Sequence, residues 1–144
     1  MIAGIFDWKK GNQFGMIAFL SYGLFWISFC AMLIFPKIGW GTAPDSMSIA
    51  LYLFIWGVFS TCMFVGTLKK SPYSLVFVFL TVVILFFLLA AHFWTGSESI
   101  LKAAGIEGVI CGLSAIYVAF GEILNPIYGR SIIPLFERNT AAKK

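Results

Sequence analysis

The stretch SLVFVFLTVVILFFLLAAHFW, from Ser74 to Trp94, contains no Asp, Glu, Lys or Arg. A helix of about 20 apolar residues spans the hydrocarbon core of a bilayer, and this stretch has that length. Three further apolar runs of similar length cover Phe14–Phe35, Met47–Leu68 and Ala103–Leu124. Gly, Pro, Ser or Asn residues follow each run and mark the breaks between helices, the last of them at Asn125-Pro126. The sequence therefore predicts an all-α, polytopic membrane helical bundle with four full transmembrane helices.

The overall composition supports this class of protein. Hydrophobic residues make up 60% of the chain and charged residues only 11%, whereas roughly 25% of the residues of a soluble domain are charged. The 16 Phe and five Trp residues suit lipid-facing helices and their interfacial belts. The net charge of +4 comes from Lys and Arg in short loops rather than from a basic stripe, so we expect a bilayer and not a nucleic acid as partner.

The basic residues also predict the orientation of the chain in the membrane. Alternation of the four spans places eight of them on one side: Lys9, Lys10, Lys69, Lys70, Arg130, Arg138, Lys143 and Lys144. Only Lys37 and Lys102 fall on the other side. Because Lys and Arg are enriched in cytoplasmic loops, we expect a multi-pass protein of the plasma membrane with a cytoplasmic C-terminus.

The first residues, MIAGIFDWKK, have the composition of the exit end of a membrane helix. The apolar stub Met1–Phe6 spans only about 9 Å, far less than the hydrocarbon core of about 30 Å. We therefore expect it to be the tail of a fifth helix, with Met1 an internal methionine or a truncated start. The expected organisation is one transmembrane transporter domain over residues 1–144 that is incomplete at its N-terminus.

Three blocks of the sequence carry a family likeness: DWKKGNQFGMIAFLSYGLFW from Asp7, LFIWGVFSTCMFVGTLKK from Leu53 and GVICGLSAIYVAFGEILNPIYGR from Gly108. They resemble the acetate uptake transporters, the YaaH-type succinate–acetate permeases, and the likeness runs from Met1 to about Phe136. The Asn-Pro-Ala-Pro-Leu-Gly signature of the family's first helix has no counterpart here. The resemblance implies a fold of six helices per subunit, assembly as a ring, commonly a hexamer, and a pore within each subunit.

Transport of a carboxylate is what the resemblance implies about function. Family members move acetate, and some move succinate, in a proton-coupled or channel-like manner. A non-transporting membrane scaffold and a degenerate, truncated copy of the transporter are the alternatives. An enzyme is not expected, because the sequence has no acid–base or metal-binding constellation, and no cofactor or metal is expected either.

Hydroxyl groups are the candidate donors for a carboxylate, because no Lys or Arg lies inside the four predicted spans. Ser21 and Ser28 are seven residues apart and share a helix face, with Tyr22 beside it. The resemblance places Tyr22 at the pore-constricting tyrosine of the family. The alternative is an aromatic packing residue whose hydroxyl bonds a nearby carbonyl.

Two further pathway positions follow from the resemblance. The family's apolar constriction falls at Leu80 or Thr81, where a leucine would form a hydrophobic gate and a threonine would add a donor. Ala115 matches a pore-lining position. Plain helix or lipid packing is the alternative for all three residues.

Ionisable and small residues mark the last predicted helix. Glu122 and Asn125 resemble the family's cytoplasmic exit, with a helix-cap role as the alternative, and Glu107 is a second acidic residue within this span. Gly108 and Gly112 form a GxxxG motif, which predicts close helix packing within the bundle or between subunits of a homo-oligomer.

Overall fold

The chain is helical throughout the part that the computed structural model describes, residues 1–138, and no strand occurs there. The elements are α1 (Ile2–Lys9), α2 (Gln13–Ile34), the 3₁₀ helix η1 (Phe35–Ile38), α3 (Ser46–Thr67), α4 (Tyr73–Thr95) and α5 (Glu98–Tyr128). Helices α2, α3, α4 and α5 are long and apolar enough to cross a membrane. The prediction of four full transmembrane helices plus a shorter helix is confirmed. Lys143 and Lys144 lie outside the described residues.

Helix α5 is longer than the sequence predicts, and this corrects the expected span Ala103–Leu124. It begins at Glu98, after a connection from α4 in which Gly96 adopts a left-handed conformation with φ 69°. It continues through Pro126 and ends at Gly129, with φ 62°. A proline inside a helix removes one backbone hydrogen bond, but this one lies in the last turn. The missing bond therefore does not stop the helix at Asn125.

The described residues form two compact units, and the first covers Met1–Asp45. In this unit α1 packs along α2 after a short turn, and the Asn12 side chain caps α2 by accepting a hydrogen bond from the Gly15 backbone N–H at 3.1 Å. Small residues bring the two helices together. A Cβ at Gly4 would lie 2.8 Å from Leu20 Cγ, and one at Gly23 would lie 2.7 Å from Met1 Cγ.

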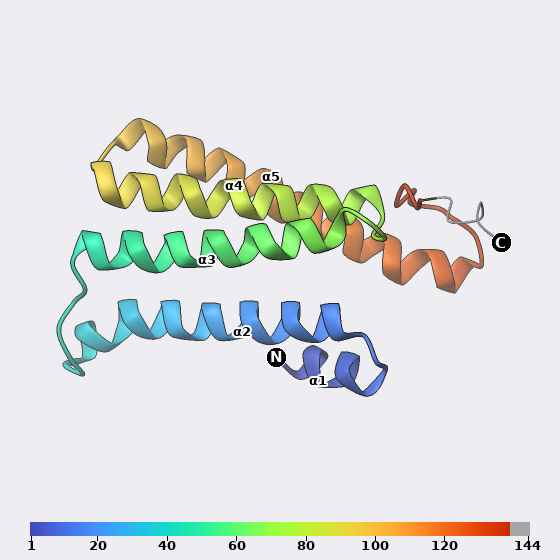
Figure 1. Cartoon of the computed structure of the whole chain (residues 1–144), viewed down its shortest axis with the longest axis horizontal. Coiled ribbons are helices and arrows are strands. Elements are labelled where there is room, and N and C mark those ends of the chain that lie inside the picture. The colour runs from blue at the N-terminus through green and yellow to red at the C-terminus, as the bar shows by residue number, and fades with distance from the viewer. Residues whose placement is uncertain (139–144) are drawn as a thin grey trace. The chain divides into compact units, whose positions relative to one another are not determined.

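The second unit begins at Ser46 and consists of α3, α4, α5 and the segment that follows them. Helix α4 packs against both α3 and α5, so it forms the middle of this unit (Figure 1). Gly57 of α3 faces Phe87 of α4, where an added Cβ would lie 2.9 Å from the ring. Leu53 and Ser60 on α3 are completely buried. The core of this unit therefore includes the α3–α4 contact.

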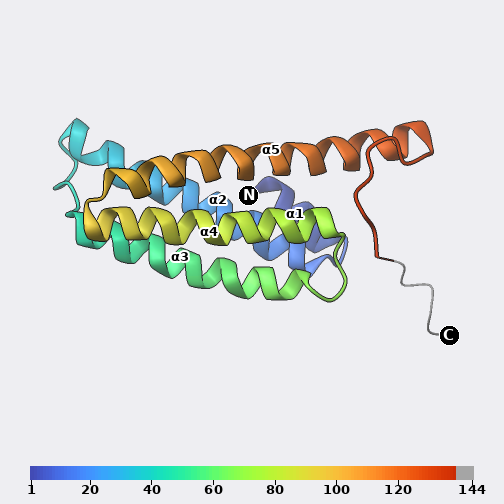
Figure 2. The ribbon, with the colours of Figure 1, turned by 90° about the horizontal axis from the view of Figure 1, so that it is seen from above.

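Helices α4 and α5 lie together near the turn that joins them. They separate toward the start of α4 and the end of α5 (Figure 2). Gly108 of α5 contacts Leu85 of α4 in the close part, since an added Cβ would lie 3.6 Å from the leucine. At the separated end the chain turns back after Gly129 and runs beside both helices. We call residues 130–138 the C-terminal strap. The side chain of Leu135 in the strap is only 6% exposed and lies against Gly121 of α5.

Candidate functional site

The predicted pathway residues are divided between the two units, and Ser21, Tyr22 and Ser28 belong to α2. Helix α1 packs on the α2 face that carries Leu20 and Gly23. Because successive residues of a helix are about 100° apart, Ser21 and Tyr22 project away from α1. Both are half-buried.

The Ser28 hydroxyl is engaged within its own helix. It donates to the backbone oxygens of Leu24 at 2.8 Å and Phe25 at 3.0 Å. Such a bond satisfies a hydroxyl inside an apolar span without a partner from another helix. Ser28 is exposed in the described part of the chain.

The structure distinguishes the two candidates on α4. Thr81 is 3% exposed, and its hydroxyl donates to the Val78 backbone oxygen at 2.8 Å. Thr81 lies near the Cys111 side chain of α5, which places the threonine on the side of α4 that faces α5. Leu80 is 38% exposed. The two candidates therefore lie in different surroundings, with Thr81 buried and Leu80 at the surface of the described residues.

Helix α5 presents small residues on an open face as well as on the face that packs against α4. Ala115 and Gly112 are exposed, and an added Cβ at Gly112 would have no atom within 4 Å. Gly108, by contrast, contacts α4. The two glycines of the GxxxG motif thus face different surroundings, and only Gly108 packs within this unit.

Asn125 anchors the C-terminal strap to α5. Its side-chain oxygen accepts hydrogen bonds from the backbone N–H groups of Ile132 at 2.8 Å and Ile133 at 2.9 Å. Its side-chain nitrogen donates to the backbone oxygen of Ile133 at 2.8 Å. Glu122, one turn earlier, is exposed. The two residues expected together at an exit therefore have different environments, and the Asn125 amide has a structural partner at each of its two polar atoms.

Further contacts of the strap involve residues that the sequence does not single out. The Tyr117 hydroxyl donates to the Pro134 oxygen at 2.7 Å, and the Ser74 hydroxyl donates to the Leu135 oxygen at 2.8 Å. Arg138 donates to the Leu68 backbone oxygen at the end of α3. These bonds join positions up to 70 residues apart, and no local spacing in the sequence signals them.

Two ionisable side chains elsewhere in the described part of the second unit, Glu107 and His92, have separate surroundings. Glu107 has one carboxylate oxygen that is buried and has no hydrogen-bond partner in the described part of the chain. The His92 ring nitrogen Nδ1 lies 3.0 Å from the Ser97 backbone oxygen in the α4–α5 turn. Among residues 1–138, no three His, Cys, Asp or Glu side chains are placed to hold a metal ion.

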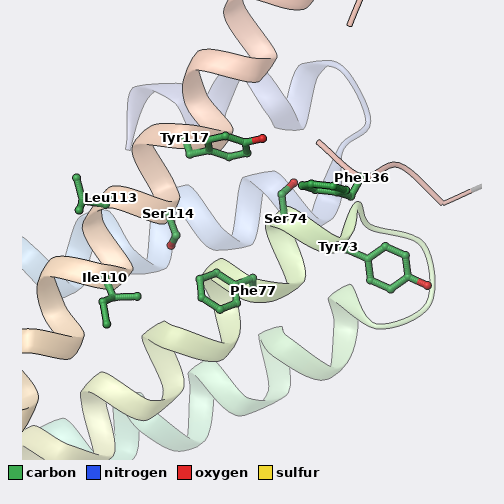
Figure 3. Close-up of a pocket in the computed structure, with 8 residues that line it drawn as sticks. All are labelled: Tyr73, Ser74, Phe77, Ile110, Leu113, Ser114, Tyr117 and Phe136. Atoms are coloured by element: carbon green, nitrogen blue, oxygen red, sulfur yellow. The ribbon is translucent and has the colours of Figure 1, made fainter. Parts of the chain in front are cut away.

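The described structure also contains a groove that the sequence does not predict. It lies on the second unit between α4, α5 and the strap and has a volume of about 580 Å³ (Figure 3). Its lining is formed by Tyr73, Ser74, Phe77, Ile110, Leu113, Ser114, Tyr117 and Phe136. None of the pathway residues expected from the resemblance is among them.

Comparison with known proteins decides the family. The model of the GPR1/FUN34/yaaH family matches residues 1–136. This chain belongs to that family. The resemblance noted in the sequence is thereby confirmed.

Relatives in the GPR1/FUN34/yaaH family include transporters of stated substrate. The succinate-acetate/proton symporter SatP of Escherichia coli K12 is 47% identical over 137 residues, which cover 95% of this chain and 72% of the symporter. Acetate permease A of Emericella nidulans is 30% identical over 151 residues, which cover 94% of this chain and 50% of the permease. The names of both relatives describe transport rather than catalysis.

A solved structure extends the comparison to three dimensions. The structure of the bacterial acetate channel SatP matches the structure of this chain with a TM-score of 0.88 and 46% sequence identity. The match covers 92% of this chain and 73% of the channel chain. The all-helical membrane fold is therefore that of the acetate channel over most of the sequence.

Proposed function

We propose that this protein is a subunit of a membrane transporter for acetate and related short carboxylates, including succinate. The observation that carries the proposal is the 47% identity to the succinate-acetate/proton symporter, together with the TM-score of 0.88 to the acetate channel. A non-transporting scaffold is not favoured, since relatives with such similarity over most of the chain are named as transporters or channels. The direct test is uptake of labelled acetate into proteoliposomes that contain the purified protein, with empty liposomes as control.

The assembly that we propose is a ring of identical subunits, a hexamer as the resemblance implies, in the plasma membrane. The C-terminus lies on the cytoplasmic side, a placement supported by the basic residues of the α3–α4 turn and the strap. The resemblance supports a pathway within each subunit. Its candidate lining residues are Ser21, Tyr22 and Ser28 on α2 and, considered separately in the second unit, Leu80 or Thr81 and Ala115. Glu122 is exposed and is the candidate for the cytoplasmic exit.

Uptake is expected to rise as the external pH falls toward the pKa of the substrate. Helices α2, α3 and α4 contain no Lys or Arg, so no fixed cation in them offsets the desolvation of a carboxylate. Movement of the neutral acid, or of the anion with a proton, avoids that cost. Above its pKa, the neutral fraction of a carboxylic acid increases about tenfold for each pH unit of acidification. Initial rates of acetate uptake across a series of external pH values check this expectation. A flux that follows only the membrane potential, at every pH, would indicate an anion channel instead.

Replacement of Tyr22 by alanine is expected to widen the pathway and to raise succinate uptake relative to acetate uptake several-fold. The aromatic ring supplies the bulk of the proposed constriction, while its hydroxyl supplies a hydrogen-bond donor. Tyr22→Phe separates the two contributions, because it keeps the bulk and removes only the hydroxyl. Phe19→Ala is the matched control, since Phe19 is an exposed aromatic residue of the same helix. If the ratio of succinate uptake to acetate uptake is the same in the wild type, Tyr22→Ala and Tyr22→Phe, Tyr22 does not form part of the constriction.

A further inference from the structure

The groove between α4, α5 and the strap has an apolar inner surface although four of its lining residues carry hydroxyl groups. The Tyr73 hydroxyl points away from the groove (Figure 3), and the other three are bonded within the protein. The Ser74 hydroxyl donates to the Leu135 oxygen, the Ser114 hydroxyl to the Cys111 oxygen at 2.7 Å, and the Tyr117 hydroxyl to the Pro134 oxygen. Each of these donors already has a partner within the protein. A ligand in the groove therefore meets mainly hydrocarbon and aromatic carbon, which suits an acyl chain and does not suit a free carboxylate.

The position of the groove along the helices also suits an acyl chain. The lining residues of α5 extend from Ile110 to Tyr117, about 10 Å along the helix axis, and those of α4 include Phe77. Figure 3 shows Ile110, Ser114 and Tyr117 on the side of α5 toward α4 and Phe77 on the side of α4 toward α5. Phe136 of the strap lies beside Ser74, while Leu113 and the Tyr73 ring point outward at the edges of the groove. Both helices are long and apolar enough to cross a membrane, so a groove between them is within reach of lipid acyl chains.

Positive charge gathers at the end of the groove where α4 begins. The Arg138 guanidinium lies 4.5 Å from the centre of the Tyr73 ring, and Tyr73 is one of the lining residues. Lys69 and Lys70 are exposed in the turn between α3 and α4, three and four residues before Tyr73. Arg130 is a fourth described basic residue at this end of the unit, beside Lys69, Lys70 and Arg138. The described acidic residues there are two, Glu122 and Glu137.

We propose that this groove binds an anionic phospholipid of the bilayer, with one acyl chain between α4 and α5 and the phosphate near Lys69, Lys70 and Arg138. Basic clusters beside membrane helices attract anionic headgroups, by roughly a fivefold gain in binding per Lys or Arg close to the surface. The apolar groove determines where the chain lies, and the basic cluster determines the preference for a negative headgroup. The proposal does not depend on which substrate is transported.

The experiment measures lipid retention by native mass spectrometry on delipidated protein incubated with phosphatidylglycerol or phosphatidylcholine of identical acyl chains. Retention of phosphatidylglycerol is expected to exceed that of phosphatidylcholine by at least about 25-fold, the combined effect of Lys69 and Lys70. The double variant Lys69→Gln, Lys70→Gln is expected to lose about 25-fold in phosphatidylglycerol retention and to keep its weak phosphatidylcholine retention. Lys102→Gln, which removes a basic residue near the opposite end of this unit, is the matched control and is expected to retain lipid as the wild type does.

A groove-filling variant tests the acyl-chain part of the site. Ser114→Phe places a ring in the groove and is expected to reduce retention of both lipids, and Ile110→Trp provides the same test from another position if Ser114→Phe does not fold. Equal retention of the two lipids by the wild type would overturn the proposal, as would full retention by a folded groove-filling variant. Loss of the oligomer in a folded groove-filling variant, without loss of lipid, would instead assign the groove to a second copy of the chain.

Discussion

Gly57→Leu is expected to destabilise the α3–α4 pair by about 3 kcal/mol, the upper end of the cost of overpacking a core. A Cβ at Gly57 would lie 2.9 Å from the Phe87 ring, and a leucine adds a branched group beyond that atom. Phe87 is held in turn by an edge-on contact with Phe54, with ring centres 5.6 Å apart. Thermal unfolding in detergent and the yield of monodisperse protein measure the effect. Gly57→Ala should lower the thermal stability less, because the Phe87 ring has to move only a few tenths of an ångström to accommodate a methyl group.

Gly112→Leu is the matched control, since the same side chain is added to α5 where no atom lies within 4 Å. The variant subunit is expected to keep its thermal stability. If the open face of α5 is the contact between subunits, the oligomer should dissociate on native gels while the subunit remains folded. Equal stability of Gly57→Leu and wild type would contradict the α3–α4 packing described here. An intact, transporting Gly112→Leu oligomer would exclude this face from assembly.

Asn125→Ala is expected to release the C-terminal strap from α5 and to lower the free energy of unfolding by about 2–4 kcal/mol. Three hydrogen bonds are lost, each contributing about 1 kcal/mol, and the backbone groups of Ile132 and Ile133 lose their partners. Release should propagate along the strap to Leu135. The backbone N–H groups of Tyr73 and Ser74, which donate to the strap at 3.1 and 3.5 Å, should then exchange faster with solvent.

Hydrogen–deuterium exchange at these amides, together with thermal unfolding, separates this role from a role in transport. Ser131→Ala is the control, because Ser131 is an exposed residue of the strap. Unchanged exchange at Ile132, Ile133 and Ser74 in the Asn125→Ala variant would contradict the anchoring role. If Asn125→Ala reduces acetate uptake and leaves hydrogen–deuterium exchange unchanged, the result would support a role of Asn125 at the exit of the pathway.

The limits of most of the long helices could be predicted from the sequence, because an apolar run and the polar residues at its ends mark where a span begins and ends. The limits of α2, α3 and α4 accordingly differ from the predicted ones by only a residue at each end. Helix α5 differs more, since its first turns carry Glu98 and Lys102 and its last turn contains Pro126. Neither polar residues nor a terminal proline prevents helix formation beyond the hydrocarbon core.

The rotation of each helix about its own axis could not be predicted in the same way. Neighbouring helices and lipid chains are both apolar, so a membrane helix need not have the polar and apolar faces that orient a helix in a soluble protein. The sequence therefore left Leu80 and Thr81 as equal candidates, and only packing against α5 distinguished the exposed leucine from the buried threonine. It likewise identified Gly108 and Gly112 as one motif, whereas the structure places only Gly108 against α4.

Sequence alone determined that this chain is an α-helical membrane protein with four spans and a family likeness to acetate transporters. Only the tertiary structure decided the course of the strap, the groove beside it and the use of the Asn125 amide. Backbone groups of the strap form hydrogen bonds with side chains of α4 and α5. One of them, the Leu135 oxygen, accepts from the Ser74 hydroxyl, 61 residues earlier in the sequence. Contacts of this kind depend on how α4 and α5 diverge, and that angle is set by side-chain packing between the helices rather than by the residues of either helix alone.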